Sequence, residues 1–315
     1  MTSPQVSVIM PVYNEEEYVS FALESILNQT FGDFELIIID GGSTDKSVNK
    51  IKSFGDSRVK LIQTDHSSGK AKDLNIGFDR AKGRYIARMD ADDIAHPKRL
   101  QAQVDFLNTN PDKLVVGSSM YLIDPNNRII SKKDVEKHPK LDTKSILNRG
   151  VPAPHPSIMI RRNAIERVGG YRPIFKKAED LDFWLRLSEV FNEDSVCNLP
   201  TRFMFYRIDG GQLLNQTGYN TLYSEAARDA ARLRQRGQDE LQILNRLEHL
   251  EPEYIKQQSP VTQATYEQYS QFRQYYIAGH YFAALRRLAK IEINMTSIRR
   301  LIWLLIRDVR IKFRM

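Results

Sequence analysis

The sequence predicts an α/β fold in which a mostly parallel central sheet lies between helices and is followed by a helical carboxy-terminal region. In the first half of the chain, short strand-type runs alternate with amphipathic stretches, which is typical of successive βα units. From about Tyr219 the composition is rich in Ala, Arg, Gln and Glu, with no further strand signal. The length of 315 residues suits one large domain with an appendage, or two domains.

The βα units can be placed one by one. The predicted strands are Val6–Met10, Phe34–Ile39, Val59–Gln63, Arg84–Met89 and Lys113–Ser119. Helices are expected between them, over about Glu15–Asn28, Thr44–Phe54, Gly69–Ala81 and Pro97–Leu107. The second strand is wholly apolar after Glu35, as expected of a strand that is buried on both faces.

The regular alternation weakens after Ser119. A turn signal at residues 124–127 and a proline-rich stretch at residues 151–156 predict an irregular, antiparallel elaboration beside the parallel sheet. A periodic helix is expected over Asp180–Phe191, with Trp184 on its apolar stripe, where core packing is favoured over stacking on a sugar. Asp209-Gly210-Gly211 breaks the pattern, so we expect a first domain of residues 1–215 and a helical region of residues 216–315.

The surplus of positive charge lies in the carboxy-terminal tail. The chain has 46 Lys and Arg against 39 Asp and Glu, a net charge of +7, and residues 286–315 contain nine basic and two acidic side chains. The rest of the chain is therefore neutral, and no nucleic-acid partner is expected. The tail has apolar residues at helical spacing, so it is predicted to lie on an anionic membrane surface or, alternatively, to dock on the first domain or a partner subunit.

The cysteine content and the amino terminus bear on the compartment. A single cysteine, Cys197, excludes a disulfide framework and a cysteine-based metal cluster, and is expected to be a buried small hydrophobe. The first apolar run is interrupted by Pro11 and then by Asn14–Glu17, so no secretory signal or membrane span is expected. These features favour a cytoplasmic protein; they leave the oligomeric state open.

Asp90-Ala91-Asp92-Asp93 places three carboxylates within four residues, at the carboxyl end of a predicted buried strand. Crowded carboxylates repel one another unless a cation or solvent relieves them. Mg²⁺ and Mn²⁺ take oxygen ligands and join carboxylates to substrate phosphates, and open α/β sheets bind ligands at this end of their strands. The alternative is a solvated acidic turn that caps the next helix.

Two earlier βα turns have the same location. Asp40 begins Asp40-Gly41-Gly42-Ser43-Thr44, where the glycines let the backbone approach a ligand and the carboxylate can accept hydrogen bonds from a base or a ribose. The first βα turn, Pro11–Glu15, is equally ambiguous. The alternative is a pair of ordinary turns, with Ser43 or Thr44 as a helix cap.

Glu179-Asp180 begins the helix that carries Trp184. A carboxylate in a cleft can act as a general base on a hydroxyl if its pKa is tuned. The alternative is a structural cap, because first-turn carboxylates are favoured by the helix dipole.

Three common enzyme classes are disfavoured by missing motifs. No G-x-G-x-x-G follows the first strand, which argues against a nicotinamide oxidoreductase. Ser68-Gly69-Lys70-Ala71 lacks the upstream glycine and the Ser or Thr of a phosphate loop. No H-E-x-x-H occurs, and the six histidines are scattered, so a zinc hydrolase is not indicated.

Taken together, the motifs resemble the family-2 glycosyltransferases, the large inverting group that uses nucleotide-activated sugars. The resemblance covers residues of about 5–210 in the family's order and spacing. The matching segments are Val6–Glu15, Leu23–Thr30, Ile39–Asp45, Leu74–Gly77, Gly83–Asp93, His155–Ser157 and Glu179–Leu187.

The resemblance implies the nucleotide-diphospho-sugar transferase (GT-A) fold, with a nucleotide-sugar half of about residues 1–120 and an acceptor half of about 121–215. It assigns the base and ribose to Pro11, Tyr13, Glu15 and Asp40. It implies that Asp90 and Asp92, with Asp93 beside them, bind the ribose and a Mg²⁺ or Mn²⁺ that bridges the diphosphate. The matching pair Glu179 and Asp180 supplies the base, Asp180, that deprotonates the acceptor hydroxyl.

Two departures limit what the resemblance carries over. Many relatives have a basic residue near the position of Ser68-Gly69-Lys70. Lys70 is therefore assigned a phosphate contact, although the resemblance does not fix the alignment at this position. Relatives often have a histidine after the pair that matches Tyr206-Arg207, whereas Ile208 follows here.

The leading hypothesis is a metal-dependent inverting glycosyltransferase that moves a sugar, with a UDP-sugar as the expected donor, to a glycan or lipid-linked glycan acceptor in polysaccharide biosynthesis. It is expected on the cytoplasmic side, peripheral to the inner face of the plasma membrane. The alternatives are a non-catalytic membrane-binding scaffold on the same fold and a sugar nucleotidyltransferase.

Overall fold

The computed structural model describes residues 3–64, 69–208 and 219–248. Residues Met1–Arg207 and Leu222–Glu248 form one compact unit. The predicted boundary near residue 215 and the basic tail of residues 286–315 lie outside the described residues. Among the described helices, none is long and apolar enough to cross a membrane.

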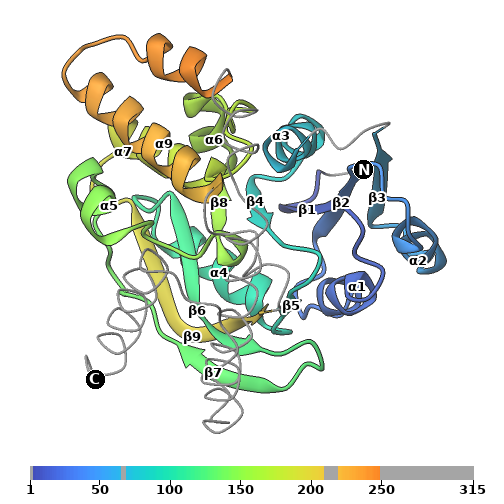
Figure 1. Ribbon diagram of the computed structural model, residues 1–315. Helices are drawn as coiled ribbons and strands as arrows, with labels where there is room; N and C mark the ends of the chain where they lie inside the picture. Colours follow the sequence, from blue (N-terminus) through green and yellow to red (C-terminus); the bar gives the residue numbers. More distant parts are fainter. Residues whose placement is uncertain (1–2, 65–68, 209–218, 249–315) are drawn as a thin grey trace, which may run out of the picture. The chain divides into compact units, whose positions relative to one another are not determined.

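The compact unit contains a sheet of nine strands in the order β3-β2-β1-β4-β8-β6-β9-β5, with β7 paired to β6 (Figure 1). Its first four strands are parallel, as the βα pattern predicts, and are β1 (Val6–Val12), β2 (Phe34–Asp40), β3 (Val59–Gln63) and β4 (Tyr85–Arg88). The helices between them are α1 (Val19–Leu27), α2 (Ser47–Ser53) and α3 (Lys70–Arg80). Every residue of β2 is buried, which confirms that both of its faces are covered.

Helix α3 packs closely on the parallel strands. A Cβ added to Gly77 would lie 2.5 Å from Cγ2 of Ile9 and 2.9 Å from Cδ1 of Ile39. A larger residue at this position would press against Ile9 and Ile39, so Gly77 lets α3, which begins at Lys70, lie close to β1 and β2.

The rest of the sheet is the mixed region that the weakened alternation predicts. Its strands are β5 (Ile94–Ala95), β6 (Val115–Ile123), β7 (Ile129–Lys133), β8 (Met159–Arg161) and β9 (Val196–Arg207). Strand β8 is antiparallel to both β4 and β6, whereas β9 is parallel to β6 and antiparallel to β5. The predicted fifth strand, β6, thus lies beyond β8 and not beside β4.

The helices of this second half are α4 (Arg99–Thr109), α5 (Thr143–Arg149), α6 (Arg162–Val168), α7 (Glu179–Val190) and α9 (Tyr219–Gln235), with the 3₁₀ turn η1 (His155–Ser157). Trp184 on α7 is fully buried, which confirms its place in the core. Cys197 is also buried, as predicted.

Candidate active site

The first two βα turns are fastened to each other. The backbone N–H of Asn14 donates to Oγ of Ser43 at 2.9 Å, and Oδ1 of Asn14 accepts from the N–H of Thr44 at 2.8 Å. Asn14 has a positive φ of 53°, a conformation that asparagine tolerates better than most residues. Ser43 and Thr44 therefore bridge the two turns, and the helix cap expected of them is wrong: α2 begins after Lys46 with no side-chain cap bond.

These turns present the residues assigned to the nucleotide. Asp40 is buried at the end of β2 and accepts a hydrogen bond from the N–H of Ser43 at 3.2 Å. Pro11 lies in β1 opposite Ile39, and Tyr13 beyond it is half exposed. The N–H of Glu15 donates to Oγ of Ser47 at 2.8 Å. Because β2, β1 and β4 are neighbouring parallel strands, these residues lie along the same sheet edge as Asp90.

We call residues 90–93, which directly follow β4, the acidic turn. One carboxylate oxygen from each of Asp90, Asp92 and Asp93 lies within 4.8 Å of the others. The side chains of Asp92 and Asp93 are buried, and the turn leads into the short strand β5 and not into a helix. The alternative of a solvated acidic turn that caps a helix is therefore wrong.

Two cations hold Asp90. Nη2 of Arg88 donates to Oδ1 of Asp90 at 2.6 Å, and Nζ of Lys70 lies 2.9 Å from the same oxygen. Burial opposes ionisation of this carboxyl, but the charges of Arg88 and Lys70 outweigh it and lower the pKa of Asp90 below its ordinary value. The pair likewise raises the pKa of Lys70, although burial opposes its charge. Asp90 is thus held as a carboxylate.

Asp93 behaves in the opposite way. Burial, followed by repulsion from Asp92 and Asp90, raises its pKa well above the ordinary value. Its Oδ1 accepts from the backbone N–H of Arg207 at 2.8 Å, whereas its Oδ2 is buried with no hydrogen-bond partner among the described residues. An orphaned carboxylate oxygen beside two further carboxylates is the donor set that Mg²⁺ or Mn²⁺ prefers, so the acidic turn fits a divalent cation.

We call Glu179 and Asp180, at the start of α7, the helix-start pair. The residue before them, Ala178, has a left-handed backbone (φ 57°), an uncommon conformation for alanine that redirects the chain into α7. Oδ1 of Asp180 accepts from the N–H of Leu181 at 2.8 Å, but the N-cap residue of α7 is Ala178, with no side-chain cap hydrogen bond, so Asp180 lies within the first turn and is not the cap. Burial is the main cause that raises the pKa of both Glu179 and Asp180.

The charges of Lys70 and Asp90 act on the helix-start pair. The charge of Lys70 lowers the pKa of both Glu179 and Asp180 against the effect of burial, and the charge of Asp90 raises that of Asp180. Lys70, which begins α3, thus forms an ion pair with Asp90, and its charge also acts on Glu179 and Asp180. The structure thus unites six of the predicted residues, namely Lys70, Asp90, Asp92, Asp93, Glu179 and Asp180.

Sequence reasoning missed two arginines that support the acidic turn. Arg207 is fully buried, and its Nε donates to the carbonyl of Asp92 at 2.7 Å while its backbone holds Asp93. Arg88 is buried at the end of β4 and holds Asp90. The sequence carries one usable signal: an arginine within the apolar run Tyr85–Met89 needs a nearby counter-charge.

A buried histidine–tyrosine pair also lies near the site. Nε2 of His155 lies 2.6 Å from the hydroxyl of Tyr171. Burial, and then the charges of Arg88 and Lys70, lower the pKa of His155 well below its ordinary value. Burial and the two cations therefore both disfavour the protonated imidazole of His155.

Residues 7–169 match the sequence profile described as glycosyl transferase family 2. The chain belongs to that family. The match includes the acidic turn and ends before the helix-start pair.

Relatives of this glycosyltransferase extend the match along the chain. An uncharacterised glycosyltransferase of Haemophilus influenzae is 31% identical over 320 residues, which cover 95% of this chain and 97% of the relative. The O-antigen biosynthesis glycosyltransferase WbnJ of Escherichia coli is 35% identical over 64% of this chain and 79% of its own length. The crystal structure of S. aureus TarS 1–349 in complex with UDP matches with a TM-score of 0.59 and 17% identity, over 90% of this chain and 87% of the TarS 1–349 chain, which supports the fold.

Proposed function

We propose that this family-2 glycosyltransferase is a metal-dependent inverting enzyme, which transfers a sugar from a UDP-sugar to a hydroxyl of a glycan or lipid-linked glycan in polysaccharide biosynthesis. One observation carries the proposal: Lys70 forms an ion pair with Asp90 of the acidic turn, and its charge also opposes the rise in the pKa of Glu179 and Asp180. The relative WbnJ acts in O-antigen biosynthesis, and the similar fold of TarS binds UDP. Both support the choice of donor and pathway class.

In this proposal the nucleotide-sugar half binds the donor. Pro11, Tyr13, Glu15 and Asp40 contact the base and ribose, and Lys70 contacts the diphosphate. Asp90, Asp92 and Asp93 hold the Mg²⁺ or Mn²⁺. When bound, such a cation supplies electrostatic stabilisation of the negative charge that builds on the departing diphosphate.

The helix-start pair acts on the acceptor. Asp180 accepts the proton of the acceptor hydroxyl, which is a poor nucleophile until a base takes that proton. The raised pKa of Asp180 makes it a stronger base than an exposed aspartate. With the base on one side of the anomeric carbon and the diphosphate on the other, a single displacement inverts the configuration.

A donor screen tests this proposal. The protein with Mn²⁺ or Mg²⁺ is expected to release nucleoside diphosphate from one nucleotide sugar, faster with an acceptor, and NMR of the product should show an inverted anomeric centre. Release of pyrophosphate would indicate the alternative nucleotidyltransferase. Calorimetry that detects no binding of any nucleotide sugar, with or without metal, would indicate the non-catalytic scaffold.

The basic tail is proposed to dock on the inner face of an anionic membrane, where a lipid-linked acceptor lies. It contributes on the order of 1 kcal/mol for each basic residue near the surface. Deleting residues 296–315 should move the protein from anionic liposomes to the supernatant. Unchanged co-sedimentation would instead favour a tail that docks on the enzyme or on a partner subunit.

A further inference from the structure

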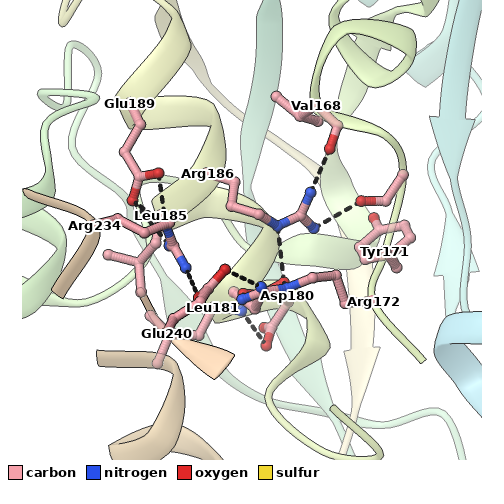
Figure 2. Close-up of polar contacts among 12 residues, drawn as sticks. Val168, Tyr171, Arg172, Asp180, Leu181, Leu185, Arg186, Glu189, Arg234 and Glu240 are labelled. Atoms are coloured by element: carbon pink, nitrogen blue, oxygen red, sulfur yellow. Dashed lines mark hydrogen bonds and ion pairs between the residues drawn. The ribbon is translucent and has the colours of Figure 1, made fainter. Parts of the chain in front are cut away.

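Asp182 lies on α7, two residues after the proposed base Asp180, and its side chain is fully buried. Nε of Arg172 donates to Oδ2 of Asp182 at 3.0 Å, and Nη2 of Arg172 binds Oδ1. Nε of Arg186 donates to Oδ2 at 2.9 Å (Figure 2). Because Asp180 and Asp182 lie on the same turn, the arginines that hold Asp182 also fix the backbone that carries Asp180.

The ion pairs continue from Arg172 into the helical region beyond β9. Nη1 of Arg172 donates to Oε1 of Glu240 at 2.6 Å, and Arg234 on α9 binds Oε2 of the same Glu240. Arg234 then pairs with Glu189, with its Nε 2.8 Å from Oε2. These ion pairs lead from Asp182 in the first turn of α7 to Glu189 in its last turn, through Arg234 on α9. Figure 2 labels the members Arg172, Glu240, Arg234 and Glu189.

The same segment is fastened to α3. The side-chain amide of Asn75 donates to the carbonyl of Tyr171 at 2.7 Å and accepts from the N–H of Tyr171 at 2.8 Å. Arg186 donates to the carbonyls of Val168 and Gly170 at 2.6 and 2.7 Å. Residues 168–172 thus join the helix that carries Lys70 to the helix that carries Asp180.

The outer members of the chain are only partly exposed. The exposed fractions of the side chains are 21% for Arg172, 19% for Arg234 and 18% for Glu240. Charges shielded to this extent are screened by salt less than surface pairs, and a network holds geometry better than an isolated pair. Neutralising Glu240 would leave Arg172 and Arg234 facing each other without the carboxylate that separates them.

We propose that Glu240 and Arg172 are positioning residues that set the orientation of Asp180 through Asp182. The inference rests on the proposed function, in which Asp180 is the base. It gives a catalytic purpose to the helical region that follows β9, which lies beyond the family match of residues 7–169. Since a small misplacement of a catalytic group is costly, loss of Glu240 should lower kcat by about tenfold.

Steady-state kinetics of Glu240→Gln test this inference, with Glu240→Asp as the conservative variant. The control is Glu225→Gln, since Glu225 is exposed on α9 and has no ion pair among the described residues. We expect kcat to fall in Glu240→Gln and to recover in Glu240→Asp, with UDP affinity unchanged and the control like wild type. An equal kcat, an equal loss in the control, or a loss confined to donor affinity would overturn the inference.

Hydrogen exchange provides a readout that is independent of activity. The peptide amides of α7 should exchange faster in Glu240→Gln than in wild type or in Glu225→Gln. If the wild-type protein transfers no sugar, the proposed function fails while this experiment still decides whether Glu240 fastens α7. Unchanged exchange would contradict the fastening whatever the activity.

Discussion

The acidic turn and the helix-start pair are both clusters of buried carboxylates, yet the protein treats them differently. In the acidic turn, Arg88 and Lys70 bind Asp90 directly and lower its pKa. In the helix-start pair, no cation forms a direct ion pair with Glu179 or Asp180 among the described residues, and burial raises both pKa values. Asp90 of the acidic turn therefore stays ionised, whereas Glu179 and Asp180, like Asp93 within the acidic turn, have an increased affinity for a proton.

This difference matches two chemical tasks. A ligand for a cation or a ribose must remain charged or polar whatever the pH near neutrality, whereas a general base must accept a proton. Because the charge of Lys70 acts on both Asp90 and Asp180, the proposed mechanism couples the binding of the donor to the basicity of Asp180 through one ammonium.

The largest expected effect comes from removing the base. Asp180→Asn should lower kcat by about 10² to 10⁴, because general-base catalysis typically contributes this much, while the affinity for UDP stays unchanged. Asp79→Asn serves as the control, since Asp79 is exposed on α3. Near-normal turnover in Asp180→Asn, measured by release of nucleoside diphosphate, would show that another group is the base.

Removing the charge of Arg88, which pairs with Asp90 of the acidic turn, should lower the free energy of unfolding. Arg88→Met leaves the largely buried Asp90 with Lys70 alone, and losing one partner of such a pair costs about 3 kcal/mol of the free energy of unfolding. Chemical denaturation measures this value. The matched variant Arg84→Met removes an exposed arginine near the same strand and should cost much less. Equal losses would mean that the Arg88–Asp90 pair contributes little.

The sequence predicted the parallel half of the fold well because its signals are local. Each βα unit carries its own periodicity, and the apolar run of β2 identifies a strand without any knowledge of its neighbours. Strands β5 and β8 are only two and three residues long, too short to show a period. In β9, Pro200 argues against a strand, but it falls at an irregularity where the register with β6 shifts from Leu199 to Arg202.

In the candidate site too, local sequence signals predict some features and miss others. Its carboxylates stand out as short motifs at strand and helix ends, and the structure places them together. Arg207 contacts the acidic turn across more than a hundred residues of sequence. Glu240 contacts Arg172, in the segment before α7, across a shorter but still long separation. No local sequence pattern predicts such contacts. Only the fold reveals which arginine holds which carboxylate.

Changing Lys70 should separate its two influences. In Lys70→Met the donor KM should rise about tenfold, because a charged contact to the diphosphate is lost. Lys70 also lowers the pKa of Asp180, so its removal raises that pKa. A base works only when deprotonated, and the acidic limb of the kcat–pH profile should therefore move to higher pH. A limb that stays in place would contradict the coupling.

The smallest expected effect is a gain in stability. Asp93→Asn removes a buried charge crowded by Asp92 and Asp90, and without added metal Tm should rise by about 2–4 °C at neutral pH, equivalent to about 1 kcal/mol. Because the pKa of Asp93 is raised in the native state, the native protein keeps the proton of this carboxyl at pH values where the unfolded chain has released it. The free energy of unfolding of the wild type therefore falls as pH rises above the ordinary aspartate pKa. The advantage of Asp93→Asn should thus grow with pH in thermal scans. A lower Tm at every pH would contradict this account of Asp93.

The division of labour between the two clusters is tested most directly by calorimetric titration of UDP with Mn²⁺ into Asp92→Asn and Asp180→Asn. The account predicts that Asp92→Asn loses the Mn²⁺-dependent part of UDP binding, by about tenfold or more in Kd, whereas Asp180→Asn binds UDP as wild type does. Intact Mn²⁺-dependent binding in Asp92→Asn, together with its loss in Asp180→Asn, would contradict the assignment of both clusters.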